Sequence, residues 1–168
     1  SHLFRLPTTG LRFFTVYGPW GRPDMAPMLF ADAILNQRPI KVFNHGQMKR
    51  DFTYIDDIVE GVVRTAMKPA TPDTDFDTAA PDSAASNAPF RVFNIGNGQP
   101  VPLMDFINAL EEALGKAAEK EFMEMQPGDV TETYADTKRL KDWVGYQPKT
   151  DIDTGVSAFV EWYLSEYE

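Results

Sequence analysis

Cysteine is absent from the chain, and histidine occurs only twice in its 168 residues, at His2 and His45. Without cysteine, disulfides and thiolate metal sites are excluded, and two histidines so far apart give no basis for a structural zinc site. No stretch approaches the ~20 apolar residues that span a membrane, and the first residues lack the apolar core of a signal peptide. The sequence therefore predicts a cytoplasmic protein without a metal or a membrane partner.

Positive charge is also scarce, since 16 Lys and Arg residues face 25 Asp and Glu residues, for a formal net charge of −9. This balance disfavours nonspecific attraction to nucleic acid or to an anionic membrane. An anionic ligand must therefore be met by a few locally placed cations. With 43% hydrophobic and 12% aromatic residues, the chain can still bury the core of an ordinary domain.

Hydrophobic patterning predicts an α/β fold. Residues 11–17 are apolar on both faces and end at Gly18-Pro19, as expected of a strand covered on two sides. Further strands are predicted over residues 40–43, 50–55, 91–96 and 121–125, and helices over residues 25–37, 56–67, 103–114, 137–143 and from Thr150 onward. Strands alternate with helices throughout, which is typical of the α/β class.

Three details of these helices can be tested against the structure. The helix that begins with Asp56 as its N-cap is expected to bury one apolar stripe: Ile58, Val59, Val62, Val63, Ala66 and Met67. Gly115 is expected to end helix 103–114 as its C-cap. The last helix is expected to begin with a Thr150-x-x-Asp153 capping box and to bury Val156, Phe159, Val160, Tyr163 and Tyr167.

Residues 69–89 interrupt this pattern. The segment holds four prolines, four aspartates and neither lysine nor arginine. Because it can bury little apolar surface, we expect a mobile Pro/Asp-rich surface loop, an insertion rather than a domain boundary.

Two segments imitate catalytic or cofactor-binding motifs without meeting their requirements. GNGQP (96–100) lies between a strand and a helix, but it lacks the third glycine of a dinucleotide-binding turn, so a simple turn is predicted. Tyr134 and Lys138 have the Tyr-x-x-x-Lys spacing of a catalytic pair, which requires one continuous helix. Asp136 is a natural N-cap between them, so Tyr134 is expected to precede the helix.

The loop after strand 11–17 is a candidate ligand site, because ligands bind α/β folds where strands end. Thr15 lies near the end of that strand, and Arg22 follows in a loop of glycines and prolines. Arg50, on another extended segment, has the fork-shaped guanidinium that suits a phosphate. A strand threonine and two solvated or paired surface arginines would explain the same residues, so the residues alone leave both interpretations open.

Five segments together resemble the carboxyl-terminal half of the extended short-chain dehydrogenase/reductases that act on nucleotide sugars, in the NAD-dependent epimerase/dehydratase family. They are LRFFTVYGPWGRPDM, MKRDFTYIDDIVEG, RVFNIGNGQPVPLMDFI, MQPGDVTETYADTKRL and FVEWY. The likeness is greatest to the UDP-glucuronate 4-epimerases and covers nearly the whole chain. It implies a fragment of an extended Rossmann-type NAD(P)-binding fold, made of the last strand region and the smaller α/β substrate-binding subdomain.

The resemblance assigns the nucleotide to residues in the middle and later parts of the chain. Arg50 corresponds to the arginine that binds the pyrophosphate, and Asp129 to the acid that holds the ribose hydroxyls. Lys41, Val42 and Phe43 match the segment that lines the uracil. The second phosphate arginine of UDP-galactose 4-epimerases is replaced here by Met125-Gln126, as is usual in the glucuronate group.

The resemblance also assigns residues to the sugar and the cofactor. Thr15 falls where a small polar residue faces the hexose, and Arg22 lies in the loop that contacts the sugar carboxylate in glucuronate epimerases. A buried arginine there would favour a uronate over a neutral hexose, because the neutral sugar leaves it without a partner. Phe13 and Phe14 lie on the strand that runs past the nicotinamide in the family.

The family's glycine-rich NAD loop and its catalytic Tyr-x-x-x-Lys have no counterpart in these 168 residues. Consequently no catalytic residue is expected in this chain, and NAD is expected to be bound mainly by the absent amino-terminal half. The implied reaction converts UDP-glucuronate to UDP-galacturonate. Hydride from C4 passes to NAD and returns to the other face of a rotated 4-keto sugar.

Three alternatives stay open at this point. The parent enzyme could be a UDP-glucose 4-epimerase or another nucleotide-sugar dehydratase or decarboxylase. The chain could instead be a noncatalytic UDP-sugar-binding module, or a structural half that self-associates. An unpaired sheet edge beside residues 11–17 predicts homo-oligomers for the isolated chain.

Overall fold

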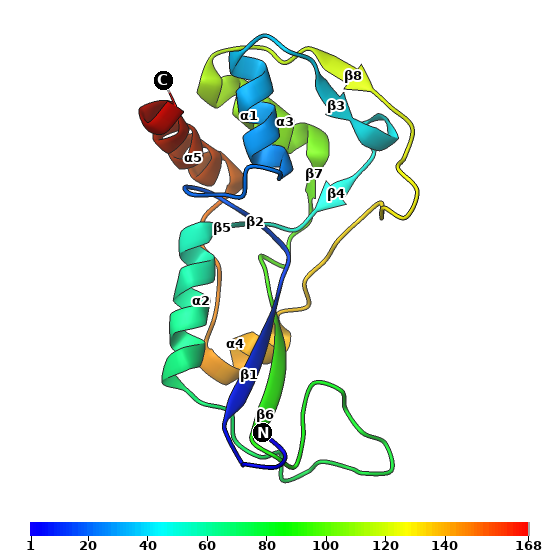
Figure 1. Cartoon of the computed structure of the whole chain (residues 1–168), viewed down its shortest axis with the longest axis vertical. Helices are drawn as coiled ribbons and strands as arrows, with labels where there is room; N and C mark the ends of the chain where they lie inside the picture. Colours follow the sequence, from blue (N-terminus) through cyan, green and yellow to red (C-terminus); the bar gives the residue numbers. More distant parts are fainter. Residues whose placement is uncertain (168) are drawn as a thin grey trace.

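The structure, a computed structural model, describes residues 1–167 and consists of two groups of elements, each with its own hydrophobic core (Figure 1). One group lies at the top of the figure and the other at the bottom, and short strands connect them. This mixed arrangement of strands and helices confirms the predicted α/β class. Among residues 1–167, no helix combines the length and hydrophobicity needed to cross a membrane.

The lower group is built on two parallel strands, β1 (Thr8–Phe13) and β6 (Phe90–Ile95), paired from Thr8↔Phe90 to Phe13↔Ile95. Helices α2 (Ile55–Met67) and α4 (Lys138–Val144) contribute Ile58 and Leu140 to a small core. In that core they meet Phe93 and Ile95, which point to the same face of β6 because side chains alternate along a strand. Within the described residues, β1 pairs with β6 alone.

The upper group has the larger core, formed where helices α1 (Ala26–Leu35), α3 (Leu103–Leu114) and α5 (Ile152–Tyr167) pack together (Figure 1). A parallel strand pair, β3 (Ile40–Val42) and β8 (Lys120–Phe122), lies beside these helices. The 3₁₀ turn η1 (Phe43–Gly46) follows β3 directly, so residues 41 and 43 lie at the edge of this group.

Two further strand pairs connect the groups. β2 (Thr15–Tyr17) runs parallel to β5 (Phe52–Tyr54), and β4 (Lys49–Arg50) runs antiparallel to β7 (Val101–Pro102). Aromatic packing fixes β5 on α3, because the rings of Phe52 and Phe106 stack with centroids 4.2 Å apart. Tyr17 packs edge-on against both rings. The backbone at Thr15 and Arg50 is therefore anchored to a packed core.

The single strand predicted over residues 11–17 is wrong in two respects. The structure begins it at Thr8 and divides it at Phe14 into β1 and β2. The chain changes partner there, since Phe14 N–H donates to Ile95 O and Thr15 N–H donates to Asp51 O. The segment is also not covered on both faces, because Phe13 is 53% exposed.

Helix α2 buries a different face from the one predicted. Its buried residues are Asp57, Ile58, Gly61 and Thr65. Most of the predicted stripe is exposed instead: Val59, Val62, Val63, Ala66 and Met67. Gly61 explains the choice, since an added Cβ there would lie 2.6 Å from Ile95 Cδ1, so the helix approaches β6 on its glycine face. The helix also begins at Ile55 rather than after Asp56.

Other predicted elements hold with small corrections. Helix 103–114 has the predicted bounds, and Gly115 follows it with φ 63°. The Thr150-x-x-Asp153 box is wrong, because Asp151 accepts the N–H of Thr154 at 2.8 Å and so caps α5. Tyr167, predicted to be buried, is 60% exposed.

The segment 69–89 forms neither helix nor strand. Its backbone is hydrogen-bonded to β6, since Val92 N–H donates to Ala84 O at 2.8 Å. Ion pairs also fix it, between Asp73 and Arg91 at 3.4 Å and between Asp82 and Arg139 at 2.7 Å. Its mobility stays a prediction.

Candidate functional site

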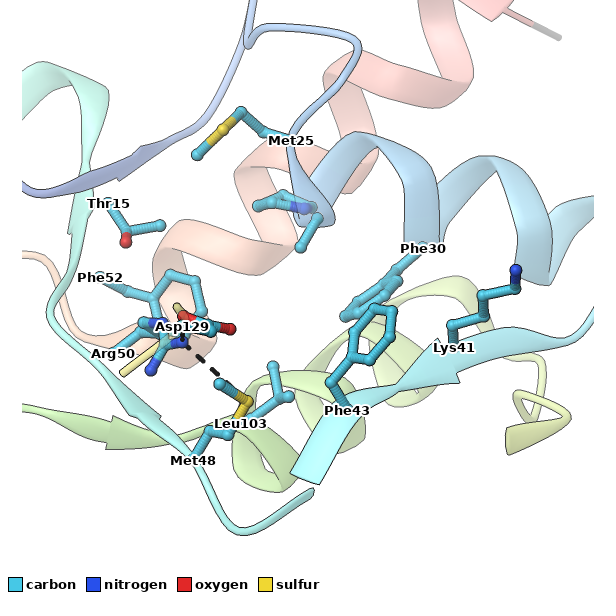
Figure 2. A pocket seen from close by; sticks show the side chains of 12 residues that line it. Thr15, Met25, Phe30, Lys41, Phe43, Met48, Arg50, Phe52, Leu103 and Asp129 are labelled. Atoms are coloured by element: carbon cyan, nitrogen blue, oxygen red, sulfur yellow. Dashed lines mark hydrogen bonds and ion pairs between the residues drawn. The ribbon is translucent and has the colours of Figure 1, made fainter. Parts of the chain in front are cut away.

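A cavity of about 190 Å³ opens between α1, β3 and the strands that connect the two groups (Figure 2). It brings together five residues that were selected from four segments of the sequence: Thr15, Lys41, Phe43, Arg50 and Asp129. The rest of its lining is mostly apolar: Met25, Ala26, Pro27, Phe30, Met48, Phe52 and Leu103. One end of the cavity is therefore charged and the other end is mainly apolar. Such a cavity suits an amphipathic ligand.

The charged end holds Arg50 and Asp129. Arg50 Nη2 donates to Asp129 Oδ1 at 2.9 Å, and only 17% of the Arg50 side chain and 32% of the Asp129 side chain are exposed. Arg50 Nη1 also donates to its neighbour's carbonyl, Lys49 O, at 3.0 Å. Since the guanidinium has five N–H donors, it keeps donors free for an anion that enters the cavity.

Backbone pairing along β4 holds these two residues together. Lys49 N–H donates to Thr131 O at 2.9 Å, and Thr133 N–H donates to Lys49 O at 3.2 Å. The segment that follows Asp129 thus runs beside β4 as a short parallel ladder. A two-residue strand held on one side by β7 and on the other by this segment gives Arg50 little freedom.

The apolar end is formed largely by aromatic and methionine side chains. Phe30 is buried on α1, and Phe43 is half-buried on η1 (Figure 2). Lys41 lies beside Phe43 on the adjoining strand and is exposed. Flat apolar surfaces next to a cation can hold a planar ring that carries polar edges.

A second cavity of about 310 Å³ adjoins the first, and Met25 lines both. It is formed by the end of β1, by β2 and by the loop that follows, and it contains three selected residues: Phe13, Phe14 and Arg22. The two cavities thus share one lining residue, Met25.

Arg22 differs from the expectation of a buried arginine. Its side chain is 74% exposed and forms two hydrogen bonds to Asp24, with Nε to Oδ1 at 3.1 Å and Nη2 to Oδ2 at 2.5 Å. The hydrogen bonding of the guanidinium to Asp24 raises the pKa of Arg22 and lowers the pKa of the Asp24 carboxyl. Arg22 therefore already holds a carboxylate in this structure.

Val42 does not reach either cavity. Its side chain is fully buried in the larger core, and its carbonyl accepts the N–H of Met123 at 2.9 Å. Strand alternation explains this, because Lys41 and Val42 must point to opposite faces of β3. Val42 therefore lies beside the site through its backbone and contributes no side chain to it.

Neither of the two imitated motifs is formed, as predicted, but the N-cap of α4 is Thr137 and not Asp136. Tyr134 precedes α4 and Lys138 is its first residue, so the pair does not share one helix. The 96–100 segment is a turn in which Gly98 has φ 69°.

Asp57 accepts backbone N–H groups of Lys149 and Thr150, which is a structural role. Within residues 1–167, no three His, Asp or Glu side chains lie close enough together to hold a metal ion.

The sequence analysis missed the apolar lining and one buried acid. Met25, Phe30 and Met48 could not be selected, because no local pattern marks a side chain that faces a cavity. Asp51 is 0% exposed and accepts three backbone N–H groups. Its one local signal is its place directly before the apolar Phe52.

Comparisons with known proteins show the family to which the chain belongs. The model of the NAD dependent epimerase/dehydratase family matches residues 1–96. The chain is 56% identical to Protein CapI of Staphylococcus aureus, over 100% of the chain and 50% of the relative. It is 48% identical to a probable UDP-glucuronate 4-epimerase of Rhizobium meliloti, over 99% of the chain and 49% of the relative.

A solved structure has the same fold over nearly the whole chain. The UDP-glucuronic acid 4-epimerase of Bacillus cereus, in complex with UDP-glucuronic acid and NAD, superposes with a TM-score of 0.80 at 32% identity. The match covers 99% of this chain and 48% of that one. The chain thus spans about half the length of the curated relatives it matches.

Proposed function

Because the chain belongs to the NAD-dependent epimerase/dehydratase family, as its sequence predicted, we propose that it is the sugar-nucleotide-binding part of a nucleotide-sugar 4-epimerase. The proposed reaction converts UDP-glucuronate to UDP-galacturonate. One observation carries the proposal: five residues from four segments, selected for a UDP-sugar site, line one cavity of matching chemistry. They are Thr15, Lys41, Phe43, Arg50 and Asp129.

In this proposal the charged end of the cavity holds the nucleotide's diphosphate and ribose. Arg50 donates to the diphosphate, and a charged hydrogen bond of this kind contributes about 1.5–3 kcal/mol. Asp129 accepts from the ribose hydroxyls with the carboxylate oxygen that Arg50 leaves free. The base lies between Phe30 and Phe43, beside Lys41, in the apolar end.

The sugar lies beside Thr15 in the first cavity and extends past Met25 toward the second cavity, where Arg22 meets it. Arg22 exchanges its bidentate contact with Asp24 for the carboxylate of the uronate. The exchange replaces one carboxylate with another, so it costs little for a uronate, whereas a neutral hexose offers no equivalent partner. This arrangement favours a uronate substrate.

The residues present fit only part of NAD. Phe13 and Phe14 line the second cavity and offer apolar faces for the nicotinamide ring. Arg22 is the one charged side chain of that lining, and it is held by Asp24, so this cavity offers nothing for the cofactor's phosphates. We therefore propose that the other half of the protein holds most of NAD. When bound, NAD supplies the hydride acceptor and donor.

The exposure of Arg22 keeps a UDP-glucose 4-epimerase as the second candidate. An arginine already paired with Asp24 need not contact the sugar at all. We also propose a cytoplasmic location and a homo-oligomer that forms through the open edge of β1.

The first test is a calorimetric titration of the chain with UDP. Wild-type protein is expected to bind, and Arg50→Ala is expected to weaken binding about tenfold to a hundredfold through loss of a charged hydrogen bond. Arg139→Ala is the matched control, because Arg139 also pairs with an aspartate but lines neither cavity. Absence of UDP binding to folded wild-type protein would contradict the proposed function.

A further inference from the structure

We infer that Asp51 is a positioning residue that sets the geometry of the Arg50–Asp129 site. It does so by fixing, at one buried point, the separate segments that carry the ligand-facing side chains. The inference rests on the proposed function only for its effect on UDP. The placement of Arg50 against Asp129 can be measured without a ligand.

The Asp51 carboxylate accepts from three backbone amides and from the Thr53 hydroxyl, which donates to Oδ1 at 3.4 Å. It is 0% exposed, and its carboxylate accepts the N–H of Asn97 at 2.7 Å, of Gly98 at 2.9 Å and of Ala135 at 2.9 Å. Both oxygens are engaged, and no lysine or arginine takes part. A buried acid satisfied by three backbone donors is matched to that local arrangement of amides.

The backbone of Asp51 holds two further segments. Its N–H donates to Thr133 Oγ1 at 3.0 Å, and its carbonyl accepts the N–H of Thr15 at 3.2 Å. The residue therefore connects β2, the 96–98 turn and the 133–135 segment to the strand on which Arg50 lies. Thr15 is bonded to Asp51 directly, and Asp129 lies a few residues before Thr133, which is also bonded to Asp51.

Asp51 controls the pair from the side opposite to the ligand. Arg50 is its immediate neighbour, so the side chains of the two residues point to opposite sides of the extended chain. The 133–135 segment that Asp51 holds is continuous with Asp129, six residues before Ala135. If the carboxylate no longer fixes Ala135 and the 97–98 turn, the ladder along β4 loosens and Asp129 moves away from Arg50.

The chain provides a matched control in Asp57. This residue is also buried, at 6% exposed, and accepts the backbone N–H of Lys149 at 3.1 Å and of Thr150 at 3.0 Å. It lines neither cavity. Substituting it removes the same chemistry from the core, and its hydrogen bonds lead to residues 149 and 150 rather than to the segments that carry Arg50, Thr15 or Asp129.

The test compares Asp51→Asn with Asp57→Asn in the 168-residue chain. Asparagine keeps the shape but turns an NH₂ group toward backbone N–H donors. In calorimetric titrations with UDP, Asp51→Asn is expected to weaken binding by about tenfold or more, whereas Asp57→Asn stays within about twofold of wild type. Both variants are expected to lower the melting temperature, so stability alone cannot produce the difference.

A gentler pair of variants covers the case in which Asp51→Asn does not fold. Thr133→Val removes the hydroxyl that accepts the Asp51 N–H, and Thr133→Ser keeps it. The valine variant is expected to lose several-fold in UDP affinity and the serine variant to recover it. Recovery by serine separates the hydrogen bond from simple packing.

A ligand-free readout separates this inference from the proposed function. The amide of Val130 donates to Asp129 Oδ1 at 2.7 Å, so its ¹H–¹⁵N resonance reports the placement of that carboxylate. The resonance is expected to shift in Asp51→Asn and Thr133→Val and not in Asp57→Asn. If wild type fails to bind UDP but the resonance shifts, the proposed function falls and the positioning role stands.

Two results would overturn the positioning role. One is a folded Asp51→Asn or Thr133→Val protein with wild-type UDP affinity and an unmoved Val130 resonance. The other is an equal loss of UDP affinity in Asp57→Asn, which would assign the effect to general loss of stability.

Discussion

The guanidinium of Arg50 and the carboxylate of Asp129 lie 2.9 Å apart, although 79 positions separate them in the chain. Each is the other's partner in the ligand-free structure. A diphosphate must therefore compete with Asp129 for the guanidinium. The pair thus sets both the affinity of the site for phosphates and its dependence on ionic strength.

Asp129→Asn is expected to tighten the binding of inorganic pyrophosphate about tenfold, because Arg50 loses a competing carboxylate. UDP is expected to gain less, since the variant also loses a charged acceptor for the ribose hydroxyls. Titrating both ligands by calorimetry gives the comparison. Equal changes for pyrophosphate and UDP would show that Asp129 does not contact the ribose.

Gly96→Ala is expected to destabilise the fold by about 1–3 kcal/mol through overpacking. A Cβ there would lie 2.6 Å from Ala135 Cβ and 3.0 Å from Asp51 Oδ1, at the point where three segments meet. Gly10→Ala is the control, because its nearest neighbour, Val92 Cγ2, lies at an ordinary 3.6 Å. Urea unfolding measures both, and equal stabilities for the two variants would contradict close packing at Gly96.

Glu111 should give the fold a component of acid sensitivity. Burial raises the pKa of its carboxyl, but the Lys120 ammonium and the Ala118 N–H outweigh burial and hold the pKa below its ordinary value of 4.5. Because the folded pKa is the lower one, this stabilisation is complete above the unfolded pKa and is lost as pH falls through the folded pKa. The contact matters for the site because it fixes β8, which pairs with the strand of Lys41.

Glu111→Gln is therefore expected to cost about 1–2 kcal/mol at pH 7 and to reduce the fall in stability between pH 6 and about pH 3. Urea unfolding across this range makes the measurement. Glu121→Gln, at an exposed position on β8, is the control. Its unfolding free energy is expected to depend on pH as that of the wild type does. An unchanged profile for Glu111→Gln would contradict the role of this carboxyl.

The outer face of α2 is a second surface, besides the edge of β1, through which the chain is expected to self-associate. Val59, Val63 and Met67 lie along it and are 50%, 55% and 81% exposed. Wild-type protein is expected to exceed the monomer mass in light scattering, and Val63→Lys to shift it toward the monomer with unfolding free energy within about 0.5 kcal/mol. Phe122→Lys, on exposed β8, should not shift it, and a monodisperse wild-type monomer would contradict the prediction.

Local pattern predicted the elements whose causes are local. Helix 103–114 has strong periodicity and a glycine stop, and its bounds are those predicted. The family could also be recognised, because its motifs are spread over the whole chain, and the match of the family model to residues 1–96 confirms it. Five site residues that were selected from these motifs line one cavity.

Features that depend on distant partners could not be predicted. Whether α2 buries Val63 or Gly61 is decided by how closely β6 approaches, and periodicity alone favours the valine stripe. The break at Phe14 exists because the chain leaves β6 for β5 there. The role of Asp51 requires amides from residues 97, 98 and 135, which no local pattern brings together.

The most direct test of the central claim is product analysis by NMR. The full-length protein that contains this chain is given NAD with UDP-glucuronate and, in parallel, with UDP-glucose. Formation of UDP-galacturonate from the first and no product from the second is the predicted result. Turnover of UDP-glucose alone would contradict the account, because Arg22 and its loop would then have no uronate to hold.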